Sequence, residues 1–498
     1  MKIVDSKRMA AIDSRAQSEY AIQAQVLMEN AGLKAYAICR DLVPEFRDTG
    51  GMILFVAGTG NNGGDALVMA RQAFIDGLNT AVLLSGPVKS ETAAANLEIV
   101  RRLGVKILSV ADEPRRARGL IGRASVVVDG LFGTGLSGRL KSGAAALVEQ
   151  INKEASKVIS VDLPSGLGDD FRRGFPVVRA DLTLCLGLPK VCLYLPAARA
   201  SCGRIIHLSI GFPPVLLNDP DISGELLQYD AIERLLPPIP PDAHKGTRGK
   251  LAVFAGNVGT TGAPVLACQS AARSRCGLVY LFIDEKAYIP VASSLVSVMA
   301  NPWKASEDCR EFDLEKFDAY LAGPGWGFEG RVPWLKRLAS SGLMGVLDAD
   351  ALTLLAGFKE AGGLGGRAVL TPHPGEMARL LSSSVEDVLD NPVGAACRAA
   401  ERYKAVVVLK GHVTTVAEPE GKYWIFDGVN PALGTGGSGD VLSGIIAGLL
   451  CEGIGVGEAA CLGVLIHGKA AELAFSERGW FLAEDLPPYV SKVMAGVS

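Results

Sequence analysis

Short apolar runs, each followed by a turn and a helical stretch, recur through the first part of the chain. They span residues 52–57, 80–84, 125–128, 157–161 and 182–186. Short, nearly continuous apolar segments between turn residues are typical of parallel strands that are buried on both faces of a sheet. The stretches 66–78 and 93–103 have helical periodicity. This alternation predicts a doubly wound α/β domain.

The same alternation starts again in the second half of the chain. Apolar runs predict strands at 251–255, 278–283, 319–322, 345–347 and 406–409, and helical patterns cover 263–275, 333–340, 392–403, 441–451 and 459–474. Seven prolines lie between Pro213 and Pro241, and proline interrupts regular structure. We therefore expect two doubly wound α/β domains, at residues 1–215 and 241–498, joined by a Pro-rich linker at 216–240.

Composition narrows the class of protein. A chain of 498 residues is too long for one ordinary core. The net charge is -3 and no long run of Lys or Arg occurs, so we expect no nucleic-acid partner. The N-terminus lacks an apolar signal region, and no uncharged apolar stretch reaches about 18 residues, so we expect a cytoplasmic protein without a membrane partner. The ten scattered cysteines form no CxxC pair and are expected to be reduced.

A glycine-rich loop in the second half carries the strongest chemical signal. Residues 434–440 read GTGGSGD and precede an apolar helical pattern. Glycine amides and a helix N-terminus together form an anion cradle, which predicts a phosphate site. Asp440 at the helix start is positioned to act as an acid or base on a hydroxyl group. These features fit a small-molecule kinase as readily as other phosphoryl-transfer chemistry.

Other loops of the second half follow predicted strands. They are Lys410-Gly411-His412, the rigid segment 371–376 (TPHPGE), the segment 323–327 (GPGWG), and Asp348 with Asp350. Open α/β sheets bind ligands at the carboxyl ends of their strands. Each loop alone is more often structural, but their shared placement after strands favours a ligand site.

The first half has its own glycine-rich loop, GTGNNGGD at 58–65, between a predicted strand and a helix expected from Ala66. This arrangement is suited to cradle a diphosphate. If the strands ending near residues 57, 128 and 161 are neighbours, then Asn62, Asp129, Asp162 and Ser165 meet in one crevice. Such oxygen ligands suit an alkali or alkaline-earth cation, although simple loop capping is the alternative for the aspartates.

The second half resembles the nucleotide-dependent NAD(P)H-hydrate dehydratases of the ribokinase-like superfamily. Its segments 244–246 (HKG), 370–377 (LTPHPGEM) and 436–442 (GGSGDVL) carry the resemblance. It implies Asp440 as the catalytic residue and Mg²⁺ with ADP or ATP. Nucleotide contacts are implied at Lys410, Gly411, His412, Val413, Thr414, Asn430, Gly434, Thr435, Gly436, Gly437, Ser438 and Gly439. Contacts to the hydrated nicotinamide are implied at Gly325, His373, Pro374, Gly375, Glu376, Met377, Ala378, Arg379 and Asp440.

Most of residues 1–215 resemble the NAD(P)H-hydrate epimerase domain, a Rossmann-like three-layer sandwich. The residues that carry this are 26–32 (VLMENAG), 61–65 (NNGGD), 129–135 (DGLFGTG) and 161–166 (VDLPSG). The resemblance implies Asp162 as an acid/base candidate and a potassium ion on Asn62, Asp129 and Ser165. Hydrate contacts are implied at Asn61, Asn62, Gly63, Gly64, Asp65, Gly133, Thr134, Gly135, Leu136, Ser137, Gly138, Arg139 and Asp162.

Together these resemblances imply a bifunctional, homo-oligomeric enzyme. It would interconvert the R and S forms of hydrated NADH or NADPH and dehydrate the S form with ADP or ATP. The alternatives are a ribokinase-like small-molecule kinase with an accessory nucleotide-binding domain, or a first domain with only a binding role. Three residues depart from the family pattern: Ala66 replaces Gly, Gly130 replaces Ala, and Trp326 replaces Leu. We expect Trp326 to pack in the interior.

Overall fold

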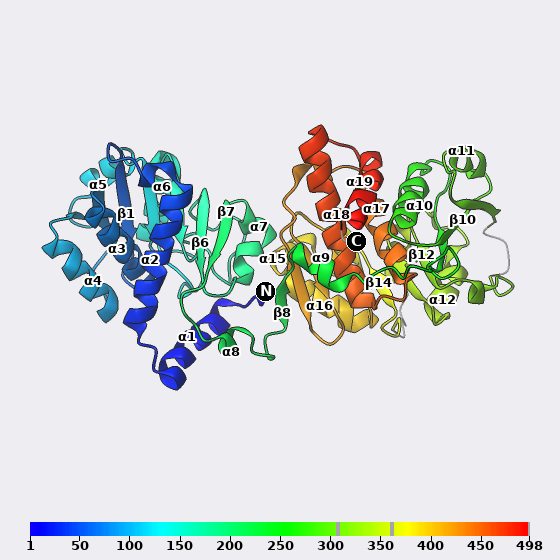
Figure 1. The fold of residues 1–498 in the computed structure, drawn as a ribbon, viewed down its shortest axis with the longest axis horizontal. Helices are drawn as coiled ribbons and strands as arrows, with labels where there is room; N and C mark the ends of the chain where they lie inside the picture. Colours follow the sequence, from blue (N-terminus) through cyan, green and yellow to red (C-terminus); the bar gives the residue numbers. More distant parts are fainter. Residues whose placement is uncertain (305–308, 359–362, 497–498) are drawn as a thin grey trace. The chain divides into compact units, whose positions relative to one another are not determined.

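The computed structural model describes residues 1–304, 309–358 and 363–496. The chain divides into two compact units, Met1–Ile222 and Ser223–Ser498 (Figure 1). Each unit has its own sheet and its own hydrophobic interior, as expected for two α/β domains.

The first unit, every residue of which is described, contains a seven-stranded parallel sheet in the order β3-β2-β1-β4-β5-β6-β7. Its strands are β1 (Met52–Ala57), β2 (Asn79–Leu84), β3 (Lys106–Ser109), β4 (Val126–Gly130), β5 (Val158–Val161), β6 (Leu182–Leu186) and β7 (Arg204–Leu208). Its helices are α1 (Ser6–Tyr20), α2 (Ala24–Leu42), α3 (Asn61–Ile75), α4 (Glu91–Arg102), α5 (Pro114–Ile121), α6 (Ser142–Glu154), α7 (Pro196–Arg199) and α8 (Pro214–Leu217), with 3-10 turns η1 (Pro44–Phe46) and η2 (Val191–Tyr194).

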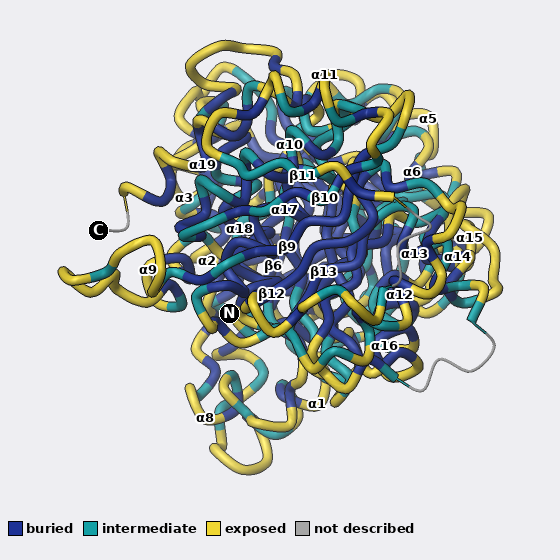
Figure 2. Tube along the Cα trace, turned by 90° about the vertical axis from the view of Figure 1, so that its right-hand side faces the viewer, coloured by how far each residue is buried: buried dark blue, intermediate teal, exposed yellow. Residues whose placement is uncertain are grey.

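Helices cover both faces of this sheet because successive strand residues point to opposite sides. Phe55 of β1 belongs to a core formed with α2, α3 and α4, whereas Leu54 and Val56 belong to a core formed with α5 and α6. Strands β1, β4, β5 and β6 are therefore almost entirely buried, whereas the edge strands β3 and β7 are only partly buried. Buried backbone lies in the interior and exposed segments lie at the periphery (Figure 2). This is the three-layer arrangement expected from the sequence.

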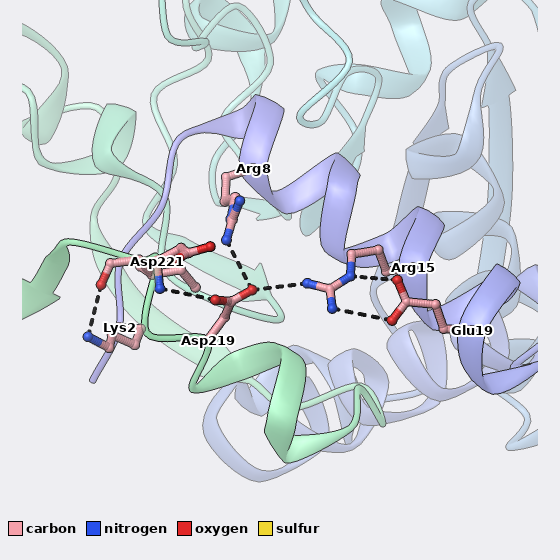
Figure 3. Close-up of polar contacts among 7 residues, drawn as sticks. Lys2, Arg8, Arg15, Glu19, Asp219 and Asp221 are labelled. Carbon is pink, nitrogen blue, oxygen red and sulfur yellow. Dashed lines mark hydrogen bonds and ion pairs between the residues drawn. The ribbon is translucent and has the colours of Figure 1, made fainter.

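The N-terminal helix α1 is tied to the last residues of the first unit (Figure 3). Arg8 and Arg15 both bind one carboxylate oxygen of Asp219, each at 3.0 Å. The Lys2 ammonium donates to the carbonyl of Ile222 at 2.9 Å. At the start of the helix, the backbone N–H of Ser6 donates to Asp169 at 2.8 Å. These contacts fix α1, which forms one wall of the cavity described below.

The second unit has a ten-stranded sheet among the described residues, in the order β11-β10-β9-β12-β13-β14-β15-β16-β17-β8. Its strands are β8 (Gly224–Leu226), β9 (Lys250–Phe254), β10 (Leu278–Asp284), β11 (Met299–Trp303), β12 (Ala319–Ala322), β13 (Met344–Leu347), β14 (Ala368–Leu370), β15 (Val406–Leu409), β16 (Thr414–Ala417) and β17 (Tyr423–Phe426). Pairing is parallel except that β16 runs antiparallel to both β15 and β17.

The helices of the second unit are α9 (Asp230–Leu235), α10 (Gly262–Arg273), α11 (Tyr288–Ala292), α12 (Arg331–Ser340), α13 (Asp350–Ala356), α14 (Pro374–Leu381), α15 (Val385–Asp390), α16 (Pro392–Tyr403), α17 (Ser438–Leu450), α18 (Val456–Arg478) and α19 (Leu486–Ala495), with 3-10 turns η3 (Leu314–Lys316), η4 (Pro431–Leu433) and η5 (Ala483–Asp485). One core joins α10, α17, α18 and α19 to one face of the sheet, and a second core joins α12, α13, α14 and α16 to the other.

Among the described residues, one helix, Val456–Arg478, is long and apolar enough to cross a membrane by composition. In this structure 67% of its apolar window is buried inside the second unit, where it packs against α17 and α19. Burial of this kind is what a core helix requires.

The segment 216–240, expected to be a Pro-rich linker, contains two regular elements. β8 adds to the edge of the second sheet beside β17, and α9 packs on α18. The sequence did not predict β8 because three residues are too few to show periodicity. The strands β3, β7, β11, β14, β16 and β17 were also not predicted, because edge strands and very short strands carry weak apolar patterns.

Helix α3 begins five residues earlier than predicted, at Asn61 rather than Ala66. The Asn-Asn-Gly-Gly-Asp segment is therefore the first turns of a helix and not a loop. Gly63 makes this possible, because a Cβ atom there would lie 2.1 Å from the carbonyl oxygen of Gly58. The early start brings Asn61, Asn62 and Asp65 to the carboxyl end of β1.

Trp326 packs in an aromatic cluster, as expected from the sequence. Its ring is fully buried and stacks on Trp303, with ring centroids 6.2 Å apart. Trp303 also contacts the edge of Trp334 at 5.0 Å and carries the guanidinium of Arg331 over its face at 4.0 Å. Trp326 thus belongs to the core beneath β9.

Replacing Trp326 with Leu should destabilise the second unit by about 2 kcal/mol, because a buried ring is replaced by a smaller group and leaves a cavity. The measurement is the unfolding transition by calorimetry. Trp480→Leu is a matched control, since Trp480 is 68% exposed, and it should change stability by less than about 0.5 kcal/mol. Equal effects of the two substitutions would contradict the packing role.

Candidate functional site

Three loops at the carboxyl ends of neighbouring strands form a cavity of about 570 Å³ in the first unit. The loops follow β1, β4 and β5, and the chain order reverses between β1 and β4. Such a reversal opens a crevice at the strand ends of a doubly wound sheet. The cavity is lined by predicted residues from all three loops, namely Asn61, Asn62, Asp65, Gly133, Thr134, Gly135, Leu136 and Asp162.

Asp162 follows β5 in a left-handed conformation, with φ of 65°, which non-glycine residues rarely adopt. One carboxylate oxygen accepts a hydrogen bond from the backbone N–H of Thr134 at 3.2 Å. The other lies 2.6 Å from the ammonium of Lys190. The unusual backbone conformation and these two contacts fix the carboxylate at the cavity wall.

Lys190 was not predicted, although it lines the cavity and is almost fully buried. Its ammonium also contacts the carbonyl of Leu186 and, at 3.7 Å, the sulfur of Cys185. Burial acts most strongly and lowers the pKa of Lys190, but the charge and hydrogen bond of Asp162, together with the charges of Cys185 and Cys192, outweigh burial and the pKa is raised. Its position four residues after the strand 182–186 was the signal available in the sequence.

Asp65 is the second carboxyl group at the cavity wall. Burial raises the pKa of Asp65 well above the ordinary value, and the nearby charge of Asp162 raises it further. Asp13 of α1 also lines the cavity, and burial raises its pKa as well. The cavity therefore combines an ion pair with two carboxyl groups whose pKa is raised by burial.

Of the three residues considered for a cation, Asp129 and Ser165 are hydrogen-bonded to each other, and Asn62 lines the cavity. Asp129 is fully buried and accepts hydrogen bonds from Ser165 and Ser160. Asn62 lines the cavity, and neither its amide oxygen nor its amide nitrogen has a partner in this structure. An unpartnered buried amide oxygen fits a ligand for a hard cation.

Five of the predicted contacts in the first unit do not line this cavity. Gly63 and Gly64 are buried within α3, where they allow close packing. The other three, Ser137, Gly138 and Arg139, continue the loop beyond Leu136, and Arg139 lies over the ring of Phe175 at 5.8 Å.

The second unit contains a cavity of about 640 Å³ built from the same kind of strand-end loops. It is lined by many of the predicted residues, namely His373, Pro374, Glu376, Lys410, Gly411, His412, Thr414, Asn430, Gly434, Thr435, Gly437, Ser438, Gly439 and Asp440. The structure therefore brings the loop 434–440, Lys410 and the segment from His373 to one place.

Lys410 and Asp348 form a buried ion pair in this cavity, with 2.8 Å between the ammonium and the carboxylate. Asp348 follows β13 and Lys410 follows β15, and both line the cavity. A Cβ atom added at Gly439 would lie 3.1 Å from the Lys410 nitrogen, so the ammonium reaches the glycine-rich loop. A phosphate at this loop would meet a fixed positive charge.

Asp440 lies in the first turn of α17, which begins at Ser438. Burial raises the pKa of Asp440 to about 7, and the charge of Asp348 adds to this effect while Lys410 opposes it. A carboxyl group that ionises near neutral pH is matched to general acid–base work.

The backbone around Asp440 is held in the shape of an anion cradle. Gly437 adopts φ of 94°, and a Cβ atom there would collide with Leu266 at 2.5 Å, so glycine is required. The hydroxyl of Ser438 donates to the carbonyl of Leu433 at 2.8 Å and fixes the loop. The N-terminus of α17 suits an anion, although the backbone N–H of Ser438 already donates to the carbonyl of Thr435 at 3.4 Å.

The HPGE segment starts helix α14 rather than forming a loop. The ring of His373 accepts from the backbone of Gly375 at 3.0 Å, and Glu376 accepts from the backbone N–H of His373 at 2.8 Å. This reciprocal capping fixes both side chains at the cavity wall. Glu376 is buried, so its carboxylate is oriented rather than mobile.

Several predicted residues do not line this cavity. Met377 and Ala378 are buried in the core, and Arg379 donates to Thr353 at 2.8 Å. Gly325, Gly375, Val413 and Gly436 are also outside its lining.

His467 of α18 lines this cavity and was not predicted, because nothing in the sequence of an apolar helix distinguishes it. Burial lowers the pKa of His467 to about 4, so its ring is neutral.

Models of known protein families match both units of the chain. Residues 24–192 match the model of the YjeF-related protein N-terminus, and residues 251–494 match the model of NAD(P)H-hydrate dehydratase. The chain is 36% identical to the bifunctional NAD(P)H-hydrate repair enzyme of Moorella thermoacetica, over 99% of this chain and 97% of that protein. It is 32% identical to the enzyme of the same name from Escherichia coli, over 92% of this chain and 87% of that protein.

Solved structures match the second unit. An ADP/ATP-dependent NAD(P)H-hydrate dehydratase from Bacillus subtilis, co-crystallised with ATP/Mg²⁺, is 28% identical, with a TM-score of 0.51, over 55% of this chain and 99% of that chain. A ribokinase-like superfamily protein from Enterococcus faecalis is 24% identical, with a TM-score of 0.50, over 55% of this chain and 97% of that chain, and supports the fold alone. The expected ribokinase-like fold is confirmed.

Replacing Asp440 with Asn should stabilise the free protein more at pH 8 than at pH 5. The folded-state pKa of about 7 lies above the value of about 3.9 for an unfolded Asp, so wild-type stability falls as pH rises between them. Because the Asn variant cannot ionise, its relative stability should increase by roughly 2–3 kcal/mol across this range. Denaturant unfolding of both proteins at pH 5 and pH 8 measures this difference in stability.

Asp242→Asn is the control, because Asp242 is exposed. It should show no pH-dependent difference from the wild type. If Asp440→Asn followed this control, the carboxyl group would ionise normally in the folded protein.

Proposed function

The chain belongs to the family of bifunctional NAD(P)H-hydrate repair enzymes, and from that premise we propose that each unit carries one of the two reactions. Residues 1–215 interconvert the R and S forms of hydrated NADH or NADPH. Residues 241–498 dehydrate the S form and use ADP or ATP as the phosphoryl donor. A stereospecific dehydratase clears both forms only if an epimerase supplies its substrate.

The dehydratase proposal is supported above all by Asp440, whose pKa is raised to about 7 beside the Lys410 ammonium and the glycine-rich loop. Asp440 takes the proton of the ring hydroxyl, and the oxygen then accepts the terminal phosphoryl group as the phosphoanhydride bond breaks. Hydroxide is a poor leaving group, but the phosphate formed here leaves readily. The phosphate leaves with the electron pair of its bond to the ring carbon, a proton on the neighbouring ring carbon passes to water, and the double bond is restored.

Binding of the nucleotide falls to the glycine-rich loop and Lys410, and binding of the hydrate to the HPGE segment. The backbone of Gly437, Ser438 and Gly439 faces the transferring phosphoryl group, and Lys410 adds positive charge. Mg²⁺ accompanies the nucleotide, and it is usually held by phosphates with one or two carboxylates. Among the described residues, no group of three His, Cys, Asp or Glu side chains is arranged to hold a metal ion by itself.

The epimerase proposal is supported by the position of Asp162, fixed at the cavity wall by Thr134 and Lys190. A carboxylate there is suited to move a proton at the hydrated carbon. We further propose a potassium ion at Asn62, Asp129 and Ser165, because the unpartnered amide oxygen of Asn62 leaves a ligand position open. When bound, the ion adds positive charge and orders these loops.

The glycine-rich loop by itself also suits a ribokinase-like kinase. The separate first unit and the HPGE segment favour hydrate repair over that alternative. A cytoplasmic location and a homo-oligomeric assembly remain predictions that follow from the resemblance.

Two substitutions should separate the reactions. Asp440→Asn should lower kcat for dehydration by about 10²–10⁴, as loss of a general base does, while exchange between the epimers continues. Asp162→Asn should lower epimerisation by a similar factor and leave one epimer unrepaired. Recovery of the dihydronicotinamide absorbance measures dehydration, and chromatographic separation of the epimers measures exchange.

Asp242→Asn and Asp112→Asn are control substitutions of exposed carboxylates, one in each unit. Both should retain both reactions. The division of labour would be wrong if either active-site substitution stopped both reactions in a folded protein.

Potassium chloride should raise the unfolding temperature of the first unit relative to choline chloride at the same ionic strength. A ligand at about 100 times its Kd stabilises the folded state by about 2.7 kcal/mol. Asn62→Ala should abolish this difference because it removes the open ligand. If potassium chloride still raised the unfolding temperature of Asn62→Ala, the ion would bind elsewhere. If potassium chloride did not raise the unfolding temperature of the wild type, the proposed site would be wrong.

A further inference from the structure

The cavity of the first unit holds one lysine and three carboxyl groups, on Asp13, Asp65, Asp162 and Lys190. They come from separate segments, since Asp13 lies on α1, Asp65 on α3, Asp162 after β5 and Lys190 after β6. A reaction at this cavity therefore has several proton carriers within its walls. Their protonation states decide which of them gives a proton and which takes one.

Asp162 and Lys190 form a buried pair whose charges cancel. The Lys190 side chain is 1% exposed and the Asp162 side chain 10% exposed, and 2.6 Å separates their charged atoms. A buried lysine without a carboxylate partner would tend to lose its proton. The pair therefore holds Asp162 as a carboxylate, which can accept a proton.

Asp65 differs from Asp162 because it has no cation beside it. Among the described residues its side chain forms no hydrogen bond or ion pair, and it is nearly fully buried. Burial and the charges of Asp162 and Asp13 raise its pKa, and Lys190 only partly opposes them. Asp65 therefore carries a proton that it can donate.

We propose that the first unit epimerises the hydrate by opening its ring, with Asp162 as the base, Asp65 as the acid, and Lys190 as the positioning residue of Asp162. This inference rests on the epimerase function proposed above. It assigns Asp65 a chemical role and not only a binding contact.

Water added to a dihydronicotinamide places its hydroxyl on the carbon next to the ring nitrogen. Asp162 takes the hydroxyl proton, the carbon–oxygen bond becomes a carbonyl, and the carbon–nitrogen bond breaks. The nitrogen keeps the electron pair of that bond and receives a proton from Asp65. Rotation of the aldehyde and reversal of these steps close the ring on the other face.

The charges at the cavity favour this route over loss of the hydroxyl group. Breaking the carbon–oxygen bond would leave a cationic ring. The negative charge of Asp162 is already balanced by Lys190, and Asp65 is neutral. The charge of Asp162 also acts on Cys185 and Cys192, which are buried thiols with raised pKa values. Ring opening keeps the substrate neutral and needs no counter-charge.

Oxygen labelling of the wild-type enzyme tests the route. One purified epimer is incubated in ¹⁸O-water without ADP or ATP, and the mass of the other epimer is measured after early turnovers. Ring opening retains the original oxygen in most of the product, after subtraction of the enzyme-free reaction. Incorporation of one ¹⁸O atom per epimerisation would overturn ring opening. No exchange of epimers would instead overturn the epimerase function itself.

Variants test the assigned residues. Asp65→Asn should lower kcat for epimerisation by at least about 10²-fold with little change in KM, and Asp65→Glu should restore part of it. In Lys190→Met, Asp162 loses its cation, so the acid limb of the kcat/KM profile should move to higher pH. Lys190→Arg keeps the charge and should keep the wild-type profile.

Lys153→Met, on an exposed lysine of α6, is the matched control and should leave the profile unchanged. If Lys190→Met lowered activity equally at every pH, Lys190 would serve only to support the fold. Full activity of Asp65→Asn would remove Asp65 from the mechanism.

Discussion

Helices cover both faces of each sheet and bury the middle of its strands. Polar and charged side chains that can react or bind are therefore confined to the ends of the strands. Ionised side chains cannot be buried among apolar neighbours without a partner. In both units the solution is a lysine–aspartate pair at the carboxyl ends of strands. Lys190 and Asp162 are 2.6 Å apart in the first unit, and Lys410 and Asp348 are 2.8 Å apart in the second. Both cavities are arranged around these pairs.

The titratable groups that accompany the ion pair differ between the two cavities. In the first unit the paired carboxylate itself lines the cavity, and an acid without an ion-pair partner, Asp65, lines it as well. In the second unit the cavity contains a further carboxyl group, Asp440, which does not belong to the ion pair. Burial together with the charge of Asp348 raises the pKa of Asp440 to about 7. The Lys410 ammonium lies at the glycine-rich loop, where a phosphate would meet its charge. The same kind of ion pair therefore lies at the site proposed for acid–base chemistry in one unit and at the site proposed for phosphoryl transfer in the other.

Much of the fold and part of each site could be predicted because they depend on local patterns. Strands β1, β6, β12 and β15 have the predicted bounds, since continuous apolar runs between turns leave few other possibilities. The loop 434–440 was identifiable because several glycines before an apolar helix have a specific use. Asn61 to Asp65 was recognised but assigned to a loop, because the packing of Gly63 against Gly58 that starts the helix there is a tertiary contact.

The sequence by itself determined the two α/β domains, the glycine-rich strand ends and the candidates Asp162 and Asp440, because apolar periodicity and loop composition are local properties of the chain. Only the tertiary structure decided which of these groups are charged and which face a cavity. Lys190 gave no motif, yet it lies against Asp162 because β5 and β6 are neighbours in the sheet. Met377 and Ala378 belong to a recognisable motif, yet they pack in the core because they lie on the buried face of α14. Protonation and access depend on burial and on the distance between groups remote in sequence, and only the folded chain fixes both.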